Sequence, residues 1–294
     1  MKHTLKLLLI CFLVNNTFGQ IKINGNVNFP TQKYKSEILD KTKQNIYYSY
    51  VYSPNTNEKA KTSLTILQIG QNYSKFTDVF LLKNDSLDKQ FSLLKNIGIN
   101  INTLPVLDVR SKGSSAIIGD RAFSDNTKIV SEIGDICIKE FHNNKIATVI
   151  KHIPGHGLAK VDSHKKTPTI NKELRYLNNH DFMAFKNKNS LFAMTAHLIY
   201  KKIDKVNTAT HSKKIIKLIR NKIKFRNILM SDDISMKSLK GSIAINTKKS
   251  FTAGCDLVLH CNGDLKEMND VALYSPVISK FIKKKTSQFY KIIS

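Results

Sequence analysis

Cysteine is scarce in this sequence, with four residues among 294. The three that follow the N-terminal region, Cys137, Cys255 and Cys261, match no zinc-binding spacing, and an odd number gives a poor disulfide framework. Cys255 and Cys261 also flank the apolar run CDLVLHC, and the two ends of a buried strand point apart. These absences argue against a zinc-binding or disulfide-stabilised class, and we expect all three cysteines to be small core residues.

Acidic residues are also scarce, with 22 Asp and Glu against 47 Lys and Arg, which gives a net charge of +25. Basic chains often bind nucleic acid. Here, however, the lysines are spread over the whole length, and the sequence has no arginine cluster, zinc-finger spacing or ribonucleoprotein motif. We therefore expect no nucleic-acid partner and interpret the charge as solvated surface. Attraction to an anionic cell-wall polymer is the functional alternative.

Long apolar runs are missing beyond residue 20, so no later segment is expected to cross a membrane. Residues 1–20, MKHTLKLLLICFLVNNTFGQ, have a short cationic start, an apolar stretch and a small-residue exit near Gly19, which is typical of a secretory signal peptide. A retained amphipathic anchor is the alternative. The sequence predicts a signal peptide over 1–20, one domain over 21–294, and an exported protein, periplasmic or extracellular, without stable membrane insertion.

Short apolar runs alternate with helical patterns along the rest of the chain. The runs are continuously apolar, which is typical of parallel strands covered on both faces; they span residues 64–70, 101–109, 146–153, 191–200, 227–234 and 255–261. Residues 127–144 and 211–226 carry apolar side chains at helical spacing. No dinucleotide-binding glycine pattern follows the first clear strand, so an α/β TIM (β/α)8 barrel is favoured over an open doubly wound sheet. Its first strands, within IKINGNVNF and NIYYSYVY, are poorly defined, so the prediction allows for an eroded first part.

Polar side chains cluster where the predicted strands end. They are Asp108, Lys151, His152, His197, Asp232 and Asp233. In a barrel the carboxyl ends of the strands share one face, and active sites lie on that face. The barrel prediction therefore turns these scattered residues into one candidate site.

The segment KHIPGHGLAKVDSHKKTP (151–168) carries three histidines and two glycines directly after a predicted strand. Its chemistry could be a metal site, an acid–base site or a polar loop without a role. The possible metal ligands are His152, His156, Asp162 and His164. The loop is long, however, and Lys151 and Lys160 would repel a cation, so we expect no metal ion and no other cofactor.

Asp162 and His164 form a possible acid–base pair. In an extended segment, residues i and i+2 point to the same side, so the carboxylate can hold one ring nitrogen and leave the other free. Such a partner orients the imidazole and favours its protonated form, as an acid–base catalyst near neutral pH requires. The alternative, an exposed Asp and His without a role, stays open on spacing alone.

Five segments together carry a resemblance to a known family: LPVLDV, IGDRAF, KHIPGHGLAKVDSHKKTP, MTAHLIY and MSDDISM. Their order and approximate spacing resemble the bacterial glycoside hydrolase family 3 β-N-acetylglucosaminidases (β-N-acetylhexosaminidases) of the single-domain, cell-wall recycling type. The similarity extends from about Leu64 to Asn262. It implies a TIM barrel and a retaining hydrolase that removes terminal β-linked N-acetylglucosamine from peptidoglycan-derived or chitin-like oligosaccharides.

The resemblance also implies roles for individual residues. Asp232 corresponds to the nucleophile, and His164, held by Asp162, corresponds to the acid–base residue. The positions that match the sugar-binding residues of the family are Arg121, Lys151, His152 and Lys75.

One segment departs from the family pattern. The family block D-Q-E-G-G-R-V-Q-R-F corresponds here to LQIGQNYSKF (67–76), so that Leu67 replaces a sugar-binding Asp while Lys75 keeps a positive charge. Loss of such a hydroxyl contact removes about 1–3 kcal/mol of binding. The alternative function is therefore a catalytically weakened barrel that binds cell-wall glycan without useful turnover.

Overall fold

The computed structural model describes part of the chain. For the N-terminal region it describes the backbone of three strands: β1 (Leu8–Val14), β2 (Ile46–Tyr52) and β3 (Thr65–Ile69). It then describes Phe91, Leu94, residues 99–114 and residues 118–293. Lys75 and the segment IKINGNVNF lie outside the described residues.

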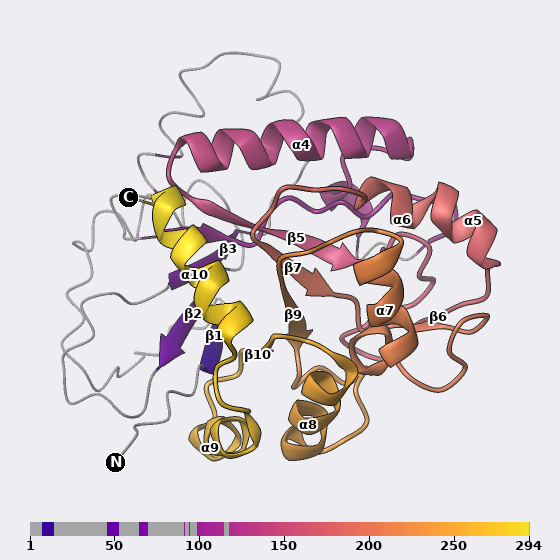
Figure 1. Ribbon diagram of the computed structural model, residues 1–294. Helices are drawn as coiled ribbons and strands as arrows, with labels where there is room; N and C mark the ends of the chain where they lie inside the picture. The colour runs from indigo at the N-terminus through magenta and orange to yellow at the C-terminus, as the bar shows by residue number, and fades with distance from the viewer. Residues whose placement is uncertain are drawn as a thin grey trace.

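The centre of the molecule is a mainly parallel sheet (Figure 1). Its remaining strands are β4 (Ile101–Asn102), β5 (Ala147–Ile153), β7 (Phe192–Thr195), β9 (Ile228–Asp233) and β10 (Leu257–His260). The strand order is β1-β10-β9-β7-β5-β4-β3-β2. All neighbours from β3 through β10 to β1 are parallel, whereas β2 is antiparallel to both β1 and β3.

Helices pack around this sheet. They are α4 (Thr127–Asn143), α5 (Leu174–Asn179), α6 (Asp181–Ala184), α7 (Lys213–Asn221), α8 (Ile243–Ala253), α9 (Leu265–Tyr274) and α10 (Lys280–Ile293). Side-chain oxygens of Asn126, Ser212 and Ser242 cap the first turns of α4, α7 and α8, so polar residues fix where these helices begin. Two 3-10 turns, η1 (Gly119–Arg121) and η2 (Ala209–His211), and a small parallel sheet of β6 (Thr169–Ile170) and β8 (Ile199–Tyr200) complete the described elements.

The α/β class and the parallel sheet are confirmed. The six apolar runs contain β3, β4, β5, β7, β9 and β10, and the two helical patterns contain α4 and α7. The full (β/α)8 arrangement is not confirmed, because the antiparallel β2 interrupts the parallel order. The run NIYYSYVY does form a strand, β2, but its partner β1 lies within residues 1–20, where we predicted a signal peptide. That peptide stays a prediction.

Two hydrophobic layers follow from the alternation of side chains along the strands. On β5, Val149 belongs to an inner cluster with Met194, Met230 and Phe289 of α10, whereas Ile150 belongs to the outer cluster beneath the helices. Successive strand residues point to opposite faces, so Lys151 continues the inner row of β5. The positively charged side chain of Lys151 therefore points to the interior of the sheet near the end of β5.

The three cysteines are free and buried, as predicted. Burial raises the pKa of the Cys137 thiol, and it raises that of Cys255 to about 12. Both thiols are therefore poor nucleophiles near neutral pH.

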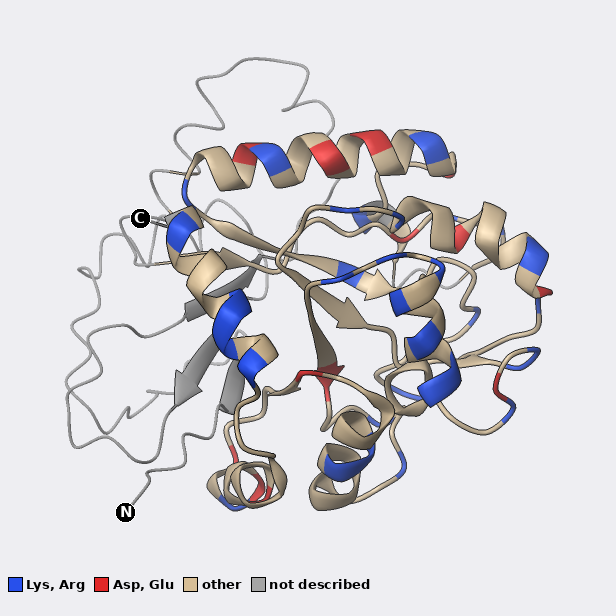
Figure 2. Ribbon diagram, viewed as in Figure 1, with Lys and Arg blue, Asp and Glu red and all other residues tan. Residues whose placement is uncertain are grey.

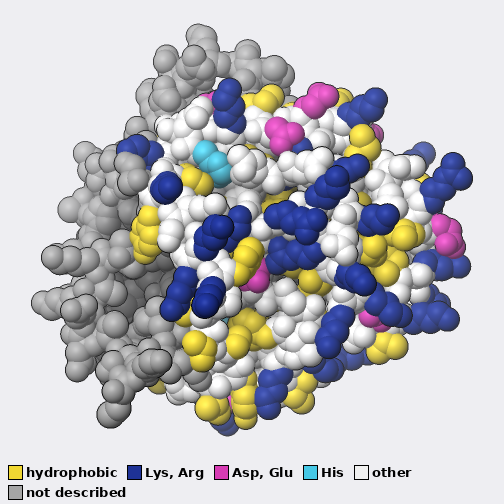
Figure 3. Space-filling view, viewed as in Figure 1, with side chains coloured by type: hydrophobic (Ala, Val, Ile, Leu, Met, Phe, Trp, Pro, Cys, Tyr) yellow, Lys and Arg dark blue, Asp and Glu magenta, His cyan; other side chains and the backbone are white. Residues whose placement is uncertain are grey.

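The basic side chains are distributed over the molecule. Figure 2 shows Lys and Arg on α4, α7 and α10 and in the loops between them, and in Figure 3 they are spread over the visible face between apolar and neutral side chains. Such a distribution is consistent with a solvated surface. Within the part of the chain that the structure describes, no helix is long and apolar enough to cross a membrane.

Candidate active site

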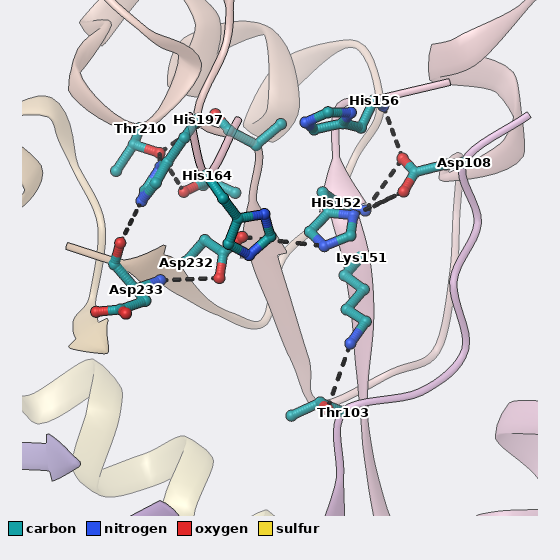
Figure 4. A network of polar contacts seen from close by, with 12 residues as sticks. Thr103, Asp108, Lys151, His152, His156, His164, His197, Thr210, Asp232 and Asp233 are labelled. Carbon is teal, nitrogen blue, oxygen red and sulfur yellow. Dashed lines mark hydrogen bonds and ion pairs between the residues drawn. The ribbon is translucent and has the colours of Figure 1, made fainter. Parts of the chain in front are cut away.

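The C-terminal ends of the parallel strands bring the predicted polar residues together (Figure 4). Lys151 and His152 lie near the end of β5, His197 follows β7, and Asp232 and Asp233 end β9. The pairing of β5 with β7 shifts register between Lys151 and Ile153. This irregularity lets the two consecutive residues Lys151 and His152 both reach the site, which regular alternation would forbid.

Asp108 holds the first turn of the 151–168 loop. Its Oδ2 lies 2.7 Å from Nδ1 of His152, and its Oδ1 accepts the backbone N–H of His156 at 2.7 Å. Burial alone would raise the pKa of Asp108, but the charges and hydrogen bonds of His152 and His156 outweigh it, so the pKa lies below its ordinary value. An ionised, fully buried carboxylate therefore fixes the orientation of the His152 ring.

Asp232 is the carboxylate that this ring faces. Its Oδ2 lies 3.9 Å from Nε2 of His152, its Oδ1 accepts the backbone N–H of Asp233 at 2.8 Å, and its side chain is 19% exposed. Burial acts to raise the pKa of Asp232, but the nearby His152, the Asp233 N–H and the charge of Lys151 lower it overall. Asp232 is thus an accessible carboxylate held in its ionised form.

Asp233, in contrast, serves the backbone. Its side-chain oxygens accept the N–H and hydroxyl of Ser235, at 3.0 and 2.7 Å, and the N–H of Cys261 at 3.2 Å. These bonds tie the turn after β9 to the end of β10. The two adjacent carboxylates therefore have different roles, one facing the site and one closing a turn.

Asp162 and His164 do contact each other, but in a turn and not in the extended segment that the spacing argument assumed. Asp162 Oδ1 accepts the backbone N–H of His164 at 2.8 Å and lies 2.9 Å from its Nδ1, which leaves Nε2 for another partner. These contacts outweigh burial and lower the pKa of Asp162. The His164 side chain is 58% exposed, and in Figure 4 its ring projects toward the face that carries Asp232 and His152.

The 151–168 loop is fixed at both ends around this exposed pair. At its start, Gly155 packs directly on the side chain of Asp181 and its carbonyl accepts the hydroxyl of Tyr200. At its end, the hydroxyl of Thr167 donates to the carbonyl of Ser238, in the turn after β9, at 2.7 Å. A loop with anchored ends and an exposed middle can close over a ligand without losing its place in the fold.

The remaining predicted binding residues lie at different depths. Lys151 is 1% exposed, and its Nζ donates to Thr103 at 3.4 Å, so its charge faces the interior beside Asp232. Arg121, in η1, is half-buried, and its charge acts on His156. Leu67 lies in β3, where its backbone pairs with Asn102 of β4.

Sequence reasoning missed the residues that support these groups. Thr210, in η2, lies 2.7 Å from Nδ1 of His197, and Thr103 receives Lys151. Neither threonine belongs to a recognisable motif, because each contact joins elements that only the folded sheet brings together. Asp108 was detectable as a strand-end carboxylate, but its pairing with His152 was not.

A metal site is the alternative that the histidines raised. Among the residues that the structure describes, no group of three or more His, Cys, Asp or Glu side chains is arranged to hold a metal ion. Instead, His152 and His164 each turn Nδ1 to a carboxylate and leave Nε2 for a partner. Two imidazoles, each oriented by an Asp, lie beside one ionised carboxylate, and this arrangement suits nucleophilic and acid–base chemistry. A nucleophile and an acid–base residue at the ends of parallel strands are typical of glycoside hydrolases.

Comparison with known proteins supports that class. Residues 89–285 match the glycosyl hydrolase family 3 N terminal domain. A β-hexosaminidase of Nitrosomonas eutropha is 32% identical over 174 residues, which is 58% of this chain and 50% of that protein. A β-hexosaminidase of Haemophilus influenzae is 29% identical over 80% of this chain and 70% of its own length. NagZ of Neisseria gonorrhoeae, crystallised in complex with N-trifluoroacetyl-D-glucosamine, aligns with a TM-score of 0.60 at 26% identity over 69% of this chain and 58% of its own.

The chain belongs to glycosyl hydrolase family 3, because the family domain covers well over half of it. It spans about half the length of the first curated relatives that it matches.

Proposed function

We propose that this chain hydrolyses terminal β-linked N-acetylglucosamine with retention of anomeric configuration. The observation that carries the proposal is Asp232, a partly exposed carboxylate held ionised at the end of β9 beside His152. Family membership and relatives named β-hexosaminidase support the reaction class. We further propose that the eight strands of the central sheet correspond to the TIM barrel of the family, with β2 as an irregular strand.

The mechanism has two steps. Asp232 attacks the anomeric carbon while His164 gives a proton to the departing oxygen, which yields a glycosyl-enzyme ester and a free alcohol. His164, now neutral, removes a proton from water, and the water oxygen attacks the same carbon and releases Asp232. Asp162 holds Nδ1 of His164 in both steps, so that Nε2 transfers the proton.

The substrate class follows from the family and from the charges around Asp232. Lys151, His152 and Arg121 supply hydrogen-bond donors, which suit the hydroxyl groups of a sugar. We propose peptidoglycan-derived or chitin-like oligosaccharides as substrates and an exported, periplasmic or extracellular location, which the N-terminal sequence favours. Lys75 is proposed as a further binding residue.

The direct experiment is release of the chromophore from an aryl β-N-acetylglucosaminide by the purified protein. Steady turnover with the β-anomer as first product supports the proposal. A folded protein that binds N-acetylglucosamine without releasing the chromophore would instead support the second candidate, a glycan-binding barrel, which the apolar Leu67 in β3 favours.

The pH dependence should reflect the lowered pKa of Asp232. Because its folded-state pKa lies below the ordinary value of about 3.9, Asp232 stays ionised down to unusually low pH. With an activated aryl glycoside, kcat/KM should therefore stay level to about pH 4, measured with circular dichroism at each pH. A loss of rate near pH 5 with the fold intact would contradict the assignment of Asp232 as nucleophile.

The lowered pKa of Asp108 affects stability. It contributes to the free energy of unfolding at higher pH, and this contribution is lost as the pH falls through the folded-state pKa of Asp108.

Leu67→Asp tests the missing sugar contact. If Leu67 replaces a carboxylate that binds sugar hydroxyls, wild-type efficiency should be low by one to two powers of ten, at about 1.4 kcal/mol per tenfold, and the substitution should recover part of it. Without a cationic partner the new charge costs stability, so a melting curve accompanies the kinetics, and Leu67→Asn serves as the uncharged control. A folded Leu67→Asp protein without any gain would show that Leu67 does not occupy that position.

A further inference from the structure

His197 lies in the candidate site but has no ring nitrogen left for a ligand. Its side chain is buried, with 1% exposed. Nδ1 lies 2.7 Å from the hydroxyl of Thr210, and Nε2 lies 2.9 Å from the backbone carbonyl of Asp233 (Figure 4). Both polar atoms of the ring thus contact the protein, so His197 acts on the site through Asp233 and not through the sugar.

The partners of His197 determine which nitrogen carries the proton. A carbonyl only accepts, so Nε2 must donate to Asp233. Burial lowers the pKa of His197, against the opposing charges of Asp232 and Asp233, and so favours the neutral ring. In a neutral ring with hydrogen on Nε2, Nδ1 is an acceptor, and Thr210 must therefore donate to it.

The hydroxyl of Thr210 has one hydrogen and two acceptors within reach, Nδ1 of His197 at 2.7 Å and the carbonyl of Ala196 at 3.3 Å. The shorter contact favours donation to His197. Thr195, whose hydroxyl lies 2.8 Å from that of Thr210, then acts as the donor between the two threonines. Hydrogen bonds therefore run in one direction, from Thr195 through Thr210 and His197 to the carbonyl of Asp233.

The far end of this chain fixes the carboxylate that reacts. The side chain of Asp233 is held by Ser235 and Cys261. Its carbonyl contacts Nε2 of His197 at 2.9 Å and accepts the N–H of Met236 at 3.2 Å. With both groups held, the N–H of Asp233 points in a set direction, and it donates to Oδ1 of Asp232 at 2.8 Å. That contact leaves Oδ2 of Asp232 on the side of His152.

We propose that His197 is a positioning residue, whose Nε2–H, required by the carbonyl of Asp233 and supported at Nδ1 by the Thr210 hydroxyl, fixes the orientation of Asp232 for attack. The proposal deepens the proposed hydrolysis and rests on it for its kinetic consequence. Without the Thr210 hydroxyl, Nδ1 of His197 loses its hydrogen-bond partner, so the ring is held less firmly against the carbonyl of Asp233 and the backbone that orients Asp232 is less well fixed.

The test compares Thr210→Val with Thr210→Ser. Thr210→Val should lower kcat about tenfold, or about 1.4 kcal/mol of barrier, with KM within about twofold, because orientation of the nucleophile affects the transition state more than sugar binding. Thr210→Ser keeps the hydroxyl and should restore kcat. Thr247→Val is the matched control: this buried threonine bonds the carbonyl of Ile243 within α8, so its loss costs stability and not kcat.

Two further measurements keep the proposal falsifiable. The nitrogen NMR shifts of the His197 ring report its tautomer whether or not the protein turns over substrate, and hydrogen on Nδ1 in the wild type would overturn the proposal. In a His197→Gln background, whose amide can donate to Asp233 without Thr210, Thr210→Val should change kcat by less than about twofold. If the wild-type protein is active and Thr210→Val leaves kcat unchanged, the proposal for His197 is wrong. If the wild-type protein is inactive but His197 carries hydrogen on Nε2, the proposed hydrolysis is contradicted and the hydrogen-bond chain is supported.

Discussion

Replacing Asp232 with Ala should abolish turnover while leaving the protein folded. Removal of a nucleophile from a catalytic unit costs about 10⁴-fold or more in kcat. The effect on stability should be small, because the carboxylate is partly exposed and contacts the backbone through one bond, from the N–H of Asp233. The measurement is chromophore release from an aryl β-N-acetylglucosaminide, with a melting curve for each variant.

The adjacent Asp233 provides the matched control. Asp233→Asn should lower the melting temperature more than Asp232→Ala does, because its side chain closes the turn after β9 through Ser235 and Cys261. Its kcat should fall far less. If Asp232→Ala kept near-wild-type activity, the nucleophile would have been misassigned, and Asp233 would be the next candidate.

Replacing His164 with Ala should separate substrates by leaving group. A general acid contributes about 10²–10⁴-fold, so kcat/KM should fall by that factor for oligosaccharides, whose departing oxygen needs a proton. Activated aryl glycosides should lose little kcat/KM, since their leaving group departs as an anion. The side chain is 58% exposed, so the fold should not change.

Variants of Asp162 and of a distant histidine serve as comparisons for His164→Ala. Asp162→Asn keeps the shape of the partner that holds Nδ1 of His164 but removes its charge, so it should give a weaker version of the same pattern. His142→Ala, on α4, should leave both substrate types unchanged. Equal losses on both substrate types in His164→Ala would assign this residue to binding or structure instead of proton transfer.

The sequence predicted the parts of the fold that depend on local pattern. Continuous apolar runs located β5, β7 and β9, because strands covered on both faces need no polar alternation. The ends of those runs located Asp232 and His152, because parallel strands present their carboxyl ends on one face. The contact between Asp162 and His164 was also predicted, but the extended geometry assumed for it was wrong, because the two residues lie in a turn.

Other features depend on contacts between distant segments. Asp108 and His152 are 44 residues apart and meet only when β5 lies beside the segment after β4. Lys151 and His152 both point inward because of a register shift against β7, and this shift cannot be predicted from the residue types. The antiparallel β2 and the place of β1 between β2 and β10 likewise follow from pairing and not from local propensity.

The central claim is that Asp232 forms a covalent bond to the sugar, and mass spectrometry of the His164→Ala protein tests it most directly. With an activated aryl β-N-acetylglucosaminide, the first step proceeds without the acid, whereas hydrolysis of the ester slows without the base, so the glycosyl-enzyme should accumulate. After quenching and digestion, the added mass of one N-acetylglucosaminyl group should be found on Asp232. Turnover without any adduct, with the α-anomer as first product, or an adduct on Asp233, would contradict the account.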